Sequence, residues 1–162
     1  MNFTDSGELY KIDILALKGV VQPNSNIEVL IKPLHKTNVS FKELLFWNIT
    51  CMGKIKVYCV YKDNELVHKS FVIKGKAKFP FLENTDIEIG PCWTDYKFRG
   101  KGYYPYVLYT IIKNELQDGG IAYMIVDDKN ISSLNGIKKV GFIKTDYVII
   151  RSKFKRYYAV KR

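Results

Sequence analysis

Alternating apolar and polar side chains predict paired strands in the middle of the chain. Residues 54–61 (KIKVYCVY) and 66–73 (LVHKSFVI) each follow the two-residue period of a strand, and the turn-forming stretch 62–65 (KDNE) separates them. This order predicts a β-hairpin. After a connection, residues 86–94 read as a third strand.

The second half of the chain predicts helices that alternate with strands. A helix is expected over residues 103–117, because Pro105 is tolerated in a first turn and the glycines at 119–120 end the helix. An apolar strand at 121–127, a helix at 130–140 and strands at 142–151 and 154–160 follow. A helix that joins two strands of one sheet makes them parallel neighbours, so we predict an α+β mixed sheet.

Residues 1–50 carry a weaker pattern. Short strands are expected at 7–17 and 27–31, on either side of the turn 22–26 (QPNSN). A short helix at 41–47 is expected to begin after Ser40. There are no internal repeats.

A glycine-rich turn lies between the third strand and the first long helix. In Arg99-Gly100-Lys101-Gly102 the glycines allow backbone N–H groups to turn toward one point. The following helix presents its unpaired N–H groups and the positive end of its dipole there. A pyrophosphate would bind well at this place, although an RGKG run also occurs in ordinary solvated turns.

A second segment, residues 130–142 (NISSLNGIKKVGF), follows one strand downstream. Together the two segments resemble the GNAT acyltransferase superfamily. The turn matches the cofactor signature of that family (Arg or Gln, two residues, Gly, one residue, Gly or Ala) through Arg99 and Gly102. The later segment matches a second family pattern through Asn130, Ser133, Lys139, Gly141 and Phe142. The resemblance covers residues 87–142, and the pair of motifs is more specific than either alone.

The resemblance implies a fold and a reaction. The fold is a mixed, mostly antiparallel sheet flanked by helices, with a V-shaped splay between two central parallel strands, in a single acyl-CoA N-acyltransferase domain over residues 1–162. The reaction is direct attack of a primary amine on the thioester of acetyl coenzyme A. The implied cofactor contacts are Cys92, Trp93 and Thr94 for the pantetheine arm, Arg99, Gly100, Lys101, Gly102, Tyr103 and Tyr104 for the pyrophosphate, and Asn130 and Ser133 on the later helix. Asn130 also suits a helix N-cap.

The sequence departs from the family pattern at two positions. Tyr104, followed by Pro105, stands where the signature has Gly or Ala. Ile137 stands where many members have a tyrosine that protonates the leaving thiolate. The thiolate would then be stabilised by helix N-terminal N–H groups, or protonated by another tyrosine or by water.

His68 and Glu88 are the candidates for the general base. Strand alternation places His68 with Ser70 on one face, and Glu88 with Cys92 and Thr94 on one face. If the two strands pair, His68 and Glu88 border one cleft. A neutral histidine accepts an ammonium proton near pH 7, which makes His68 the first candidate and Glu88 the second. The alternative for both residues is that they are ordinary side chains of the sheet without a catalytic role.

The acceptor is predicted from a finer resemblance. Family members that act on nucleotide-linked amino sugars are similar in the run Ile-Gly-Pro-Cys-x-Thr at residues 89–94 and in a histidine like His68. We therefore predict such an amine, in surface polysaccharide synthesis, as the acceptor. The alternatives are a protein or small-amine acetyltransferase and a non-catalytic coenzyme A-binding module. A homodimer is compatible with the sequence.

Composition excludes several other classes. The formal net charge of +10 invites a nucleic-acid function, but the lysines are scattered between strand residues, and a basic surface also suits polyphosphate ligands. Three cysteines without CxxC spacing and two histidines argue against a disulfide framework and a metal site. No apolar run approaches a membrane span, and the N-terminal residues do not resemble a secretory signal. The predicted location is cytoplasmic.

Overall fold

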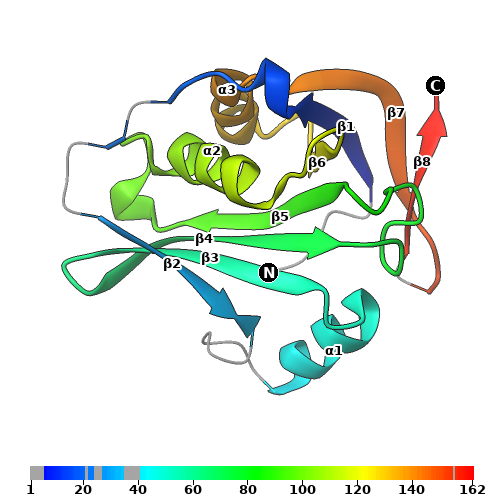
Figure 1. The fold of residues 1–162 in the computed structure, drawn as a ribbon, viewed down its shortest axis with the longest axis horizontal. Coiled ribbons are helices and arrows are strands. Elements are labelled where there is room, and N and C mark those ends of the chain that lie inside the picture. Colours follow the sequence, from blue (N-terminus) through cyan, green and yellow to red (C-terminus); the bar gives the residue numbers. More distant parts are fainter. Residues whose placement is uncertain (1–5, 21, 24–26, 35–40, 155) are drawn as a thin grey trace.

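One mixed sheet forms the centre of the protein (Figure 1). The computed structural model describes residues 6–20, 22–23, 27–34, 41–154 and 156–162. In this part of the chain the strand order is β2-β3-β4-β5-β6-β1-β7-β8, and every neighbouring pair is antiparallel except β5 and β6. The strands are β1 (Ser6–Asp13), β2 (Glu28–Pro33), β3 (Ile55–Lys62), β4 (Glu65–Lys74), β5 (Ile87–Thr94), β6 (Ile121–Val126), β7 (Ile143–Arg151) and β8 (Tyr157–Lys161).

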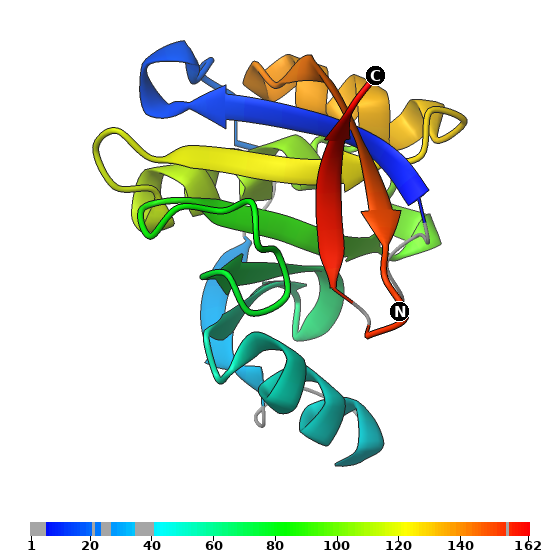
Figure 2. The same cartoon turned by 90° about the vertical axis from the view of Figure 1, so that its right-hand side faces the viewer.

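Helices cover the sheet on both faces. The helices α2 (Tyr103–Glu115) and α3 (Ile131–Val140) lie together on one face, and α1 (Phe41–Cys51) lies away from them at the other side of the molecule (Figure 2). Apolar side chains of α2 pack on strand residues such as Val72 and Ile89 to form the α2-side core. The α1-side core forms on the opposite face and includes Trp47, Phe71, Ile73 and Phe79.

The two parallel strands separate after a short paired segment. Only Ile87 with Ala122 and Glu88 with Tyr123 are in register between β5 and β6, although both strands continue. On its other side, β5 shifts register against β4 between Ser70 and Val72. Pro91 has no N–H to give to a ladder, so the bulge falls where β5 leaves β6. This is the predicted V-shaped splay.

Most predicted elements are present with slightly shifted bounds. The two N-terminal strands lie far apart in the sheet. β1 is inserted between β6 and β7, and β2 is the edge strand beside β3. The physical reason is that β1 is apolar on both faces: Leu9 lies in the α1-side core, whereas Tyr10 and Ile12 lie in the α2-side core. Such a strand needs a central position.

The expected first strand also ends earlier than predicted. Asp13 ends β1 because its carboxylate accepts a hydrogen bond of 2.8 Å from the N–H of Ala16 and thereby caps the short 3₁₀ helix Ile14–Ala16. Three residues of the predicted turn 22–26 and the predicted helix start at Ser40 lie outside the described residues.

Candidate active site

A cavity of about 570 Å³ opens where β5 ends and α2 begins. Cys92, Trp93 and Thr94 contribute to it from the end of β5, and Tyr103 and Tyr104 from the first turn of α2. The cavity lies beside the splay, so the last residues of β5 reach it without a strand partner on the β6 side. These five residues were predicted from the sequence to contact a cofactor, and the fold brings them to one place.

The glycine turn supplies a second wall of the cavity. Arg99, Gly100 and Gly102 line it, whereas Lys101 does not. Gly100 and Gly102 have φ angles of +76° and +84°, a region that favours glycine, and Gly102 is the N-cap of α2. The Nε of Arg99 donates to the carbonyl of Thr94 at 3.2 Å, which ties the turn to the end of β5.

Helix α3 closes the cavity from the other side. Asn130 and Ser133 line it, and Asn130 is also the N-cap, since its side chain accepts from the N–H of Ser133 at 3.1 Å. Sequence reasoning missed Ser132, Asn135 and Gly136, which also line it. Their spacing along a short helix is the signal that identifies one helix face.

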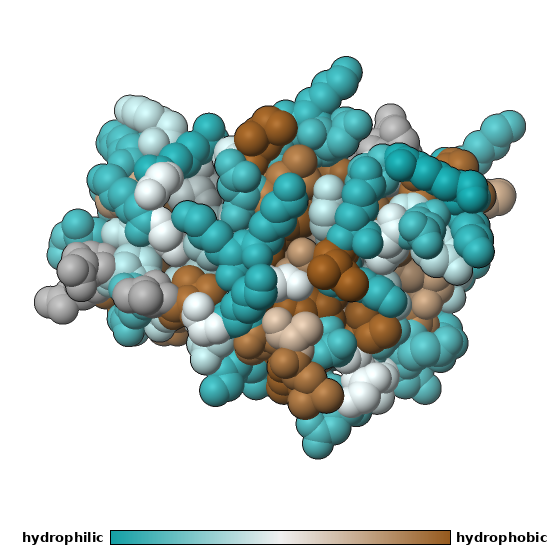
Figure 3. All heavy atoms as spheres, turned by 90° about the horizontal axis from the view of Figure 1, so that it is seen from above, coloured by the Kyte–Doolittle hydropathy of each residue, from teal (hydrophilic) through white to brown (hydrophobic). Residues whose placement is uncertain are grey.

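The charges around this cavity have one sign. Arg99 and Lys139 line it, and no carboxylate of the described residues does. The N-terminus of α2 adds the positive end of a helix dipole. Seen from above Figure 1, the surface is mainly hydrophilic, with apolar patches interspersed among polar side chains (Figure 3). The cavity thus suits a polyphosphate.

Tyr104 fits at a position where the family signature has a small residue because Gly136 leaves room for its ring. A Cβ atom at Gly136 would lie 2.5 Å from Cδ1 of Tyr104. The Tyr104 hydroxyl donates to the sulfur of Met124 at 4.0 Å, and burial raises the pKa of Tyr104 well above its usual value. The phenol is therefore neutral at physiological pH, and its ring forms part of the cavity wall.

The pair Tyr104 and Gly136 makes a testable prediction. Gly136→Ala should weaken coenzyme A binding by about 10-fold, because the added methyl displaces the Tyr104 ring into the cavity. In a Tyr104→Ala background the same change should have little effect, so a double-mutant cycle measured by calorimetric titration should give strong coupling. Additive effects would contradict the direct contact.

His68 is buried beside this cavity but does not line it. Its Nδ1 lies 2.7 Å from Oγ1 of Thr94 and its Nε2 lies 2.7 Å from Oγ of Ser70. Burial lowers the pKa of His68 to about 3. The imidazole is therefore neutral and has both nitrogens engaged, which disfavours the predicted role of direct base.

Glu88 is completely buried, and neither carboxylate oxygen has a hydrogen-bond partner among the described residues. Burial raises the pKa of Glu88 well above its usual value, and the positive charge of Lys78 opposes the rise. Native proteins rarely leave a buried carboxyl group without a partner, so such a group points to a functional role.

The expectation that His68 and Glu88 border one cleft is wrong. Glu88 pairs with Ile73, which packs in the α1-side core, whereas His68 pairs with Thr94 and contacts the Tyr104 ring on the α2 side. The register shift in β5 breaks the simple alternation between Glu88 and Cys92 that the sequence suggested. The two residues lie on opposite faces of the sheet.

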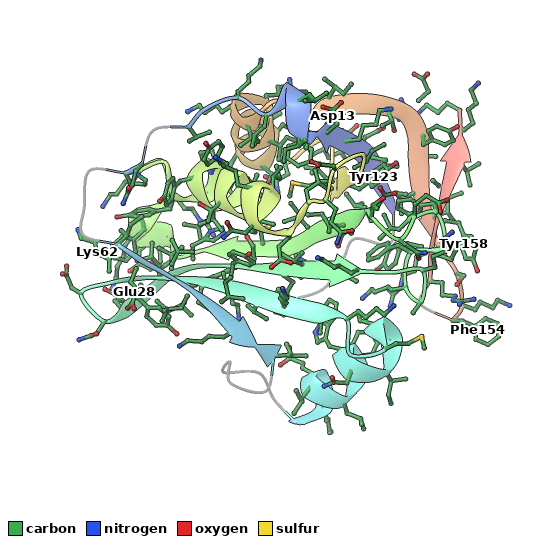
Figure 4. All side chains as sticks on the ribbon, in the orientation of Figure 1. Asp13, Glu28, Lys62, Tyr123, Phe154 and Tyr158 are labelled. Atoms are coloured by element: carbon green, nitrogen blue, oxygen red, sulfur yellow. The ribbon has the colours of Figure 1, made fainter. Side chains whose placement is uncertain are left out.

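A second cavity of about 470 Å³ lies on the face that Glu88 occupies. Three aromatic rings line it, from Phe81, Tyr123 and Tyr147, together with Lys11, Lys144 and Asp146. Tyr123, labelled in Figure 4, is the register partner of Glu88 across β5 and β6. Sequence reasoning missed this cavity because it depends on the central position of β1.

The described residues were also compared with the geometry of metal sites and with the helices of membrane proteins. No group of three or more His, Cys, Asp or Glu side chains among them is placed to hold a metal ion. In the same part of the chain, none of the helices has the length and apolar character needed to cross a membrane.

Comparison with known proteins shows the fold. No protein-family model matches the sequence, and no curated protein matches it as a relative. Among solved structures, it is similar to a GNAT-family acetyltransferase from Colwellia psychrerythraea, with a TM-score of 0.63, 12% identity, and coverage of 90% of this chain and 55% of that one. It is also similar to a conserved protein of unknown function from Staphylococcus epidermidis, with a TM-score of 0.60, 14% identity, and coverage of 86% of this chain and 57% of that one. For a GCN5-related N-acetyltransferase from Kribbella flavida the TM-score is 0.52 and the identity 11%, with coverage of 86% of this chain and 54% of that one.

These similarities confirm the predicted fold class. The chain has the GNAT fold, with the parallel pair β5 and β6 at its centre. It spans a little over half the length of the structures it matches.

Proposed function

We propose that this protein is an N-acetyltransferase that binds acetyl coenzyme A in the cavity between β5, α2 and α3 and transfers the acetyl group to a primary amine. The observation that carries the proposal is the cavity itself. It joins a glycine turn, a helix N-terminus and two cations to the splayed end of a strand. Phosphates and an extended amide-bearing arm need these features.

The residues that line the cavity fit coenzyme A in one orientation, with its pyrophosphate at the glycine turn and its pantetheine arm along β5. The pyrophosphate would lie against the N–H groups between Gly100 and Tyr104, near Arg99 and Lys139. The pantetheine arm would then follow β5 backward from Thr94 to Cys92. Bound acetyl coenzyme A would supply a thioester, and in this orientation the thioester would lie near the closed end of the splay.

We propose Glu88, rather than His68, as the general base. Glu88 is the last residue of β5 in register with β6, so it lies at the closed end of the splay. Its unpartnered carboxyl group and raised pKa suit a group that takes a proton from an amine near neutral pH. After the ammonium has given its first proton to solvent, deprotonated Glu88 would take the proton that the neutral amine loses as its nitrogen attacks the carbonyl carbon.

The second cavity supports an acceptor that carries a ring and negative charge. Phe81, Tyr123 and Tyr147 offer aromatic faces, and Lys11 offers a cation. A nucleotide-linked amino sugar has these groups, and we propose this class, with a place in surface polysaccharide synthesis, as the acceptor. Its amine would approach the thioester from the Glu88 face.

The rival function is a coenzyme A-binding module without catalysis. Ile137 favours it, because the position where many members of the resembled family carry a tyrosine holds a completely buried apolar side chain here. A tyrosine phenol is therefore missing from that place.

Turnover measured on the purified protein separates the two functions. Acetyl coenzyme A should raise the melting temperature, and release of free thiol should depend on an added amine, with nucleotide-linked amino sugars fastest in a panel that includes polyamines and a lysine peptide. Stabilisation without thiol release on any amine would support the binding module. No stabilisation by coenzyme A would overturn both functions.

A further inference from the structure

A chain of hydrogen bonds connects His68 to the cavity wall at both ends. The Oγ of Ser70 donates to Sγ of Cys92 at 3.1 Å. A hydroxyl has one hydrogen, so Ser70 must accept from Nε2 of His68, which lies 2.7 Å away. A neutral imidazole has one N–H, so Nδ1 accepts from the hydroxyl of Thr94 at 2.7 Å.

The number of hydrogens in this hydrogen-bond chain determines whether Thr94 and Cys92, at its two ends, offer a donor or an acceptor to the cavity. The hydroxyl hydrogen of Thr94 is used inside the chain, so Thr94 has only acceptor capacity left. The sulfur of Cys92 accepts from Ser70, so its own S–H hydrogen is not used in the chain. Because Cys92 and Thr94 both line the cavity, one wall presents a fixed acceptor and, two residues away, a fixed donor.

Cys92 is also the β5 residue of the cavity wall that lies nearest to the closed end of the splay. On the proposed function, this is where the thioester sulfur lies. Burial raises the pKa of the Cys92 thiol to about 12, so the group keeps its hydrogen at neutral pH. Burial likewise keeps His68 neutral, which preserves the direction of the chain.

We propose that the Cys92 thiol is a catalytic hydrogen-bond donor to the sulfur of the departing coenzyme A thiolate, and that His68 and Ser70 are positioning residues that orient it. The inference rests on the proposed function and supplies the stabilisation that Ile137 does not. In the step, the C–N bond forms and the C–S bond breaks. The amine proton goes to Glu88, and the thiolate keeps its electron pair beside the S–H group until it takes a proton from water after release.

Calorimetric titration with coenzyme A and desulfo-coenzyme A tests the donor at Cys92 without turnover. In the unmodified protein, coenzyme A should gain affinity over the desulfo compound as pH rises from 7 to 9.5, because the bound thiolate is stabilised. Cys92→Ala should reduce that gain by about 10-fold, since a hydrogen bond to a charged group is lost. Cys92→Ser keeps a donor and should retain most of the gain.

The positioning role has its own readout. Ring ¹⁵N chemical shifts of His68 should show the Nε2–H tautomer, with no titration between pH 5 and 9. Ser70→Ala should leave desulfo-coenzyme A binding unchanged and lose part of the pH-dependent gain of coenzyme A. If an amine is turned over, Ser70→Ala and Cys92→Ala should lower kcat with little change in KM for acetyl coenzyme A.

Each failure has a distinct meaning. The opposite tautomer, or an equal pH-dependent gain in Cys92→Ala and the unmodified protein, would overturn this inference and leave the proposed function standing. A protein that bound neither coenzyme A nor its desulfo analogue would overturn the proposed function and the inference with it.

Discussion

Glu88→Gln is expected to lower kcat by about 100-fold or more, because glutamine has the shape of glutamate but accepts no proton from the amine. The dissociation constant for coenzyme A should change little, since Glu88 does not line the cofactor cavity. Steady-state kinetics on the amine that turns over, together with calorimetric titration, measure both quantities.

The same substitution should stabilise the protein at neutral pH. Burial raises the pKa of Glu88 in the folded state, so the folded state holds a proton that the unfolded chain releases above pH ~4.3. The free energy of unfolding of the unmodified protein therefore falls as pH rises through that value toward the folded pKa. Glu88→Gln removes this loss, and denaturant unfolding at pH 4 and pH 7 should show the difference only at pH 7.

Glu115→Gln is the matched control. Glu115 is also a buried acid, but it accepts hydrogen bonds of 2.9 Å from both Lys56 and Tyr58, and these bonds lower its pKa. This control should lose stability at pH 7 and keep normal kcat. Full activity of Glu88→Gln would return the base role to water or to another group.

Gly141→Ala is expected to destabilise the fold by about 3 kcal/mol, which combines left-handed backbone strain with a steric clash. Gly141 ends α3 with a φ of +116°, and a Cβ atom there would lie 2.6 Å from the carbonyl oxygen of Ala16. The clash is with backbone, which has no rotamer to change. The melting temperature should fall by about 10 °C.

Gly119→Ala separates the two contributions. Gly119 also has a positive φ, of +75°, but no atom lies within 4 Å of its added Cβ. It should therefore lose only the strain, about 1 kcal/mol. Equal losses at the two glycines would show that the contact with Ala16 has no role.

Local sequence patterns were sufficient to predict most of the fold. The hairpin of β3 and β4, the turn before α2, and the α3 segment each have signals within a short stretch, namely alternation, paired glycines and an N-cap. The position of β1 was missed because strand pairing across the whole chain leaves no local mark. Leu9, Tyr10 and Ile12 together do indicate burial on both faces.

The candidate site likewise has one part that local sequence patterns predict and one part that they do not. Much of the cavity wall was predictable because its residues lie close together in the sequence, between Arg99 and Tyr104 with the exception of Lys101, and again from Asn130. The relation of His68 to Glu88 was not predictable, because a one-residue shift at the bulge moves Glu88 to the other face of the sheet. The low pKa of His68 depends on burial, which alternation alone does not fix.

The central position of β1 has a consequence for the order in which the protein is made. Of the described strands β1 is synthesised first, yet its partners β6 and β7 come much later in the sequence. Pairings this distant in sequence form late, because the long loop must close before any contact is gained. We therefore expect β1 to enter the sheet late, after β6 has been synthesised.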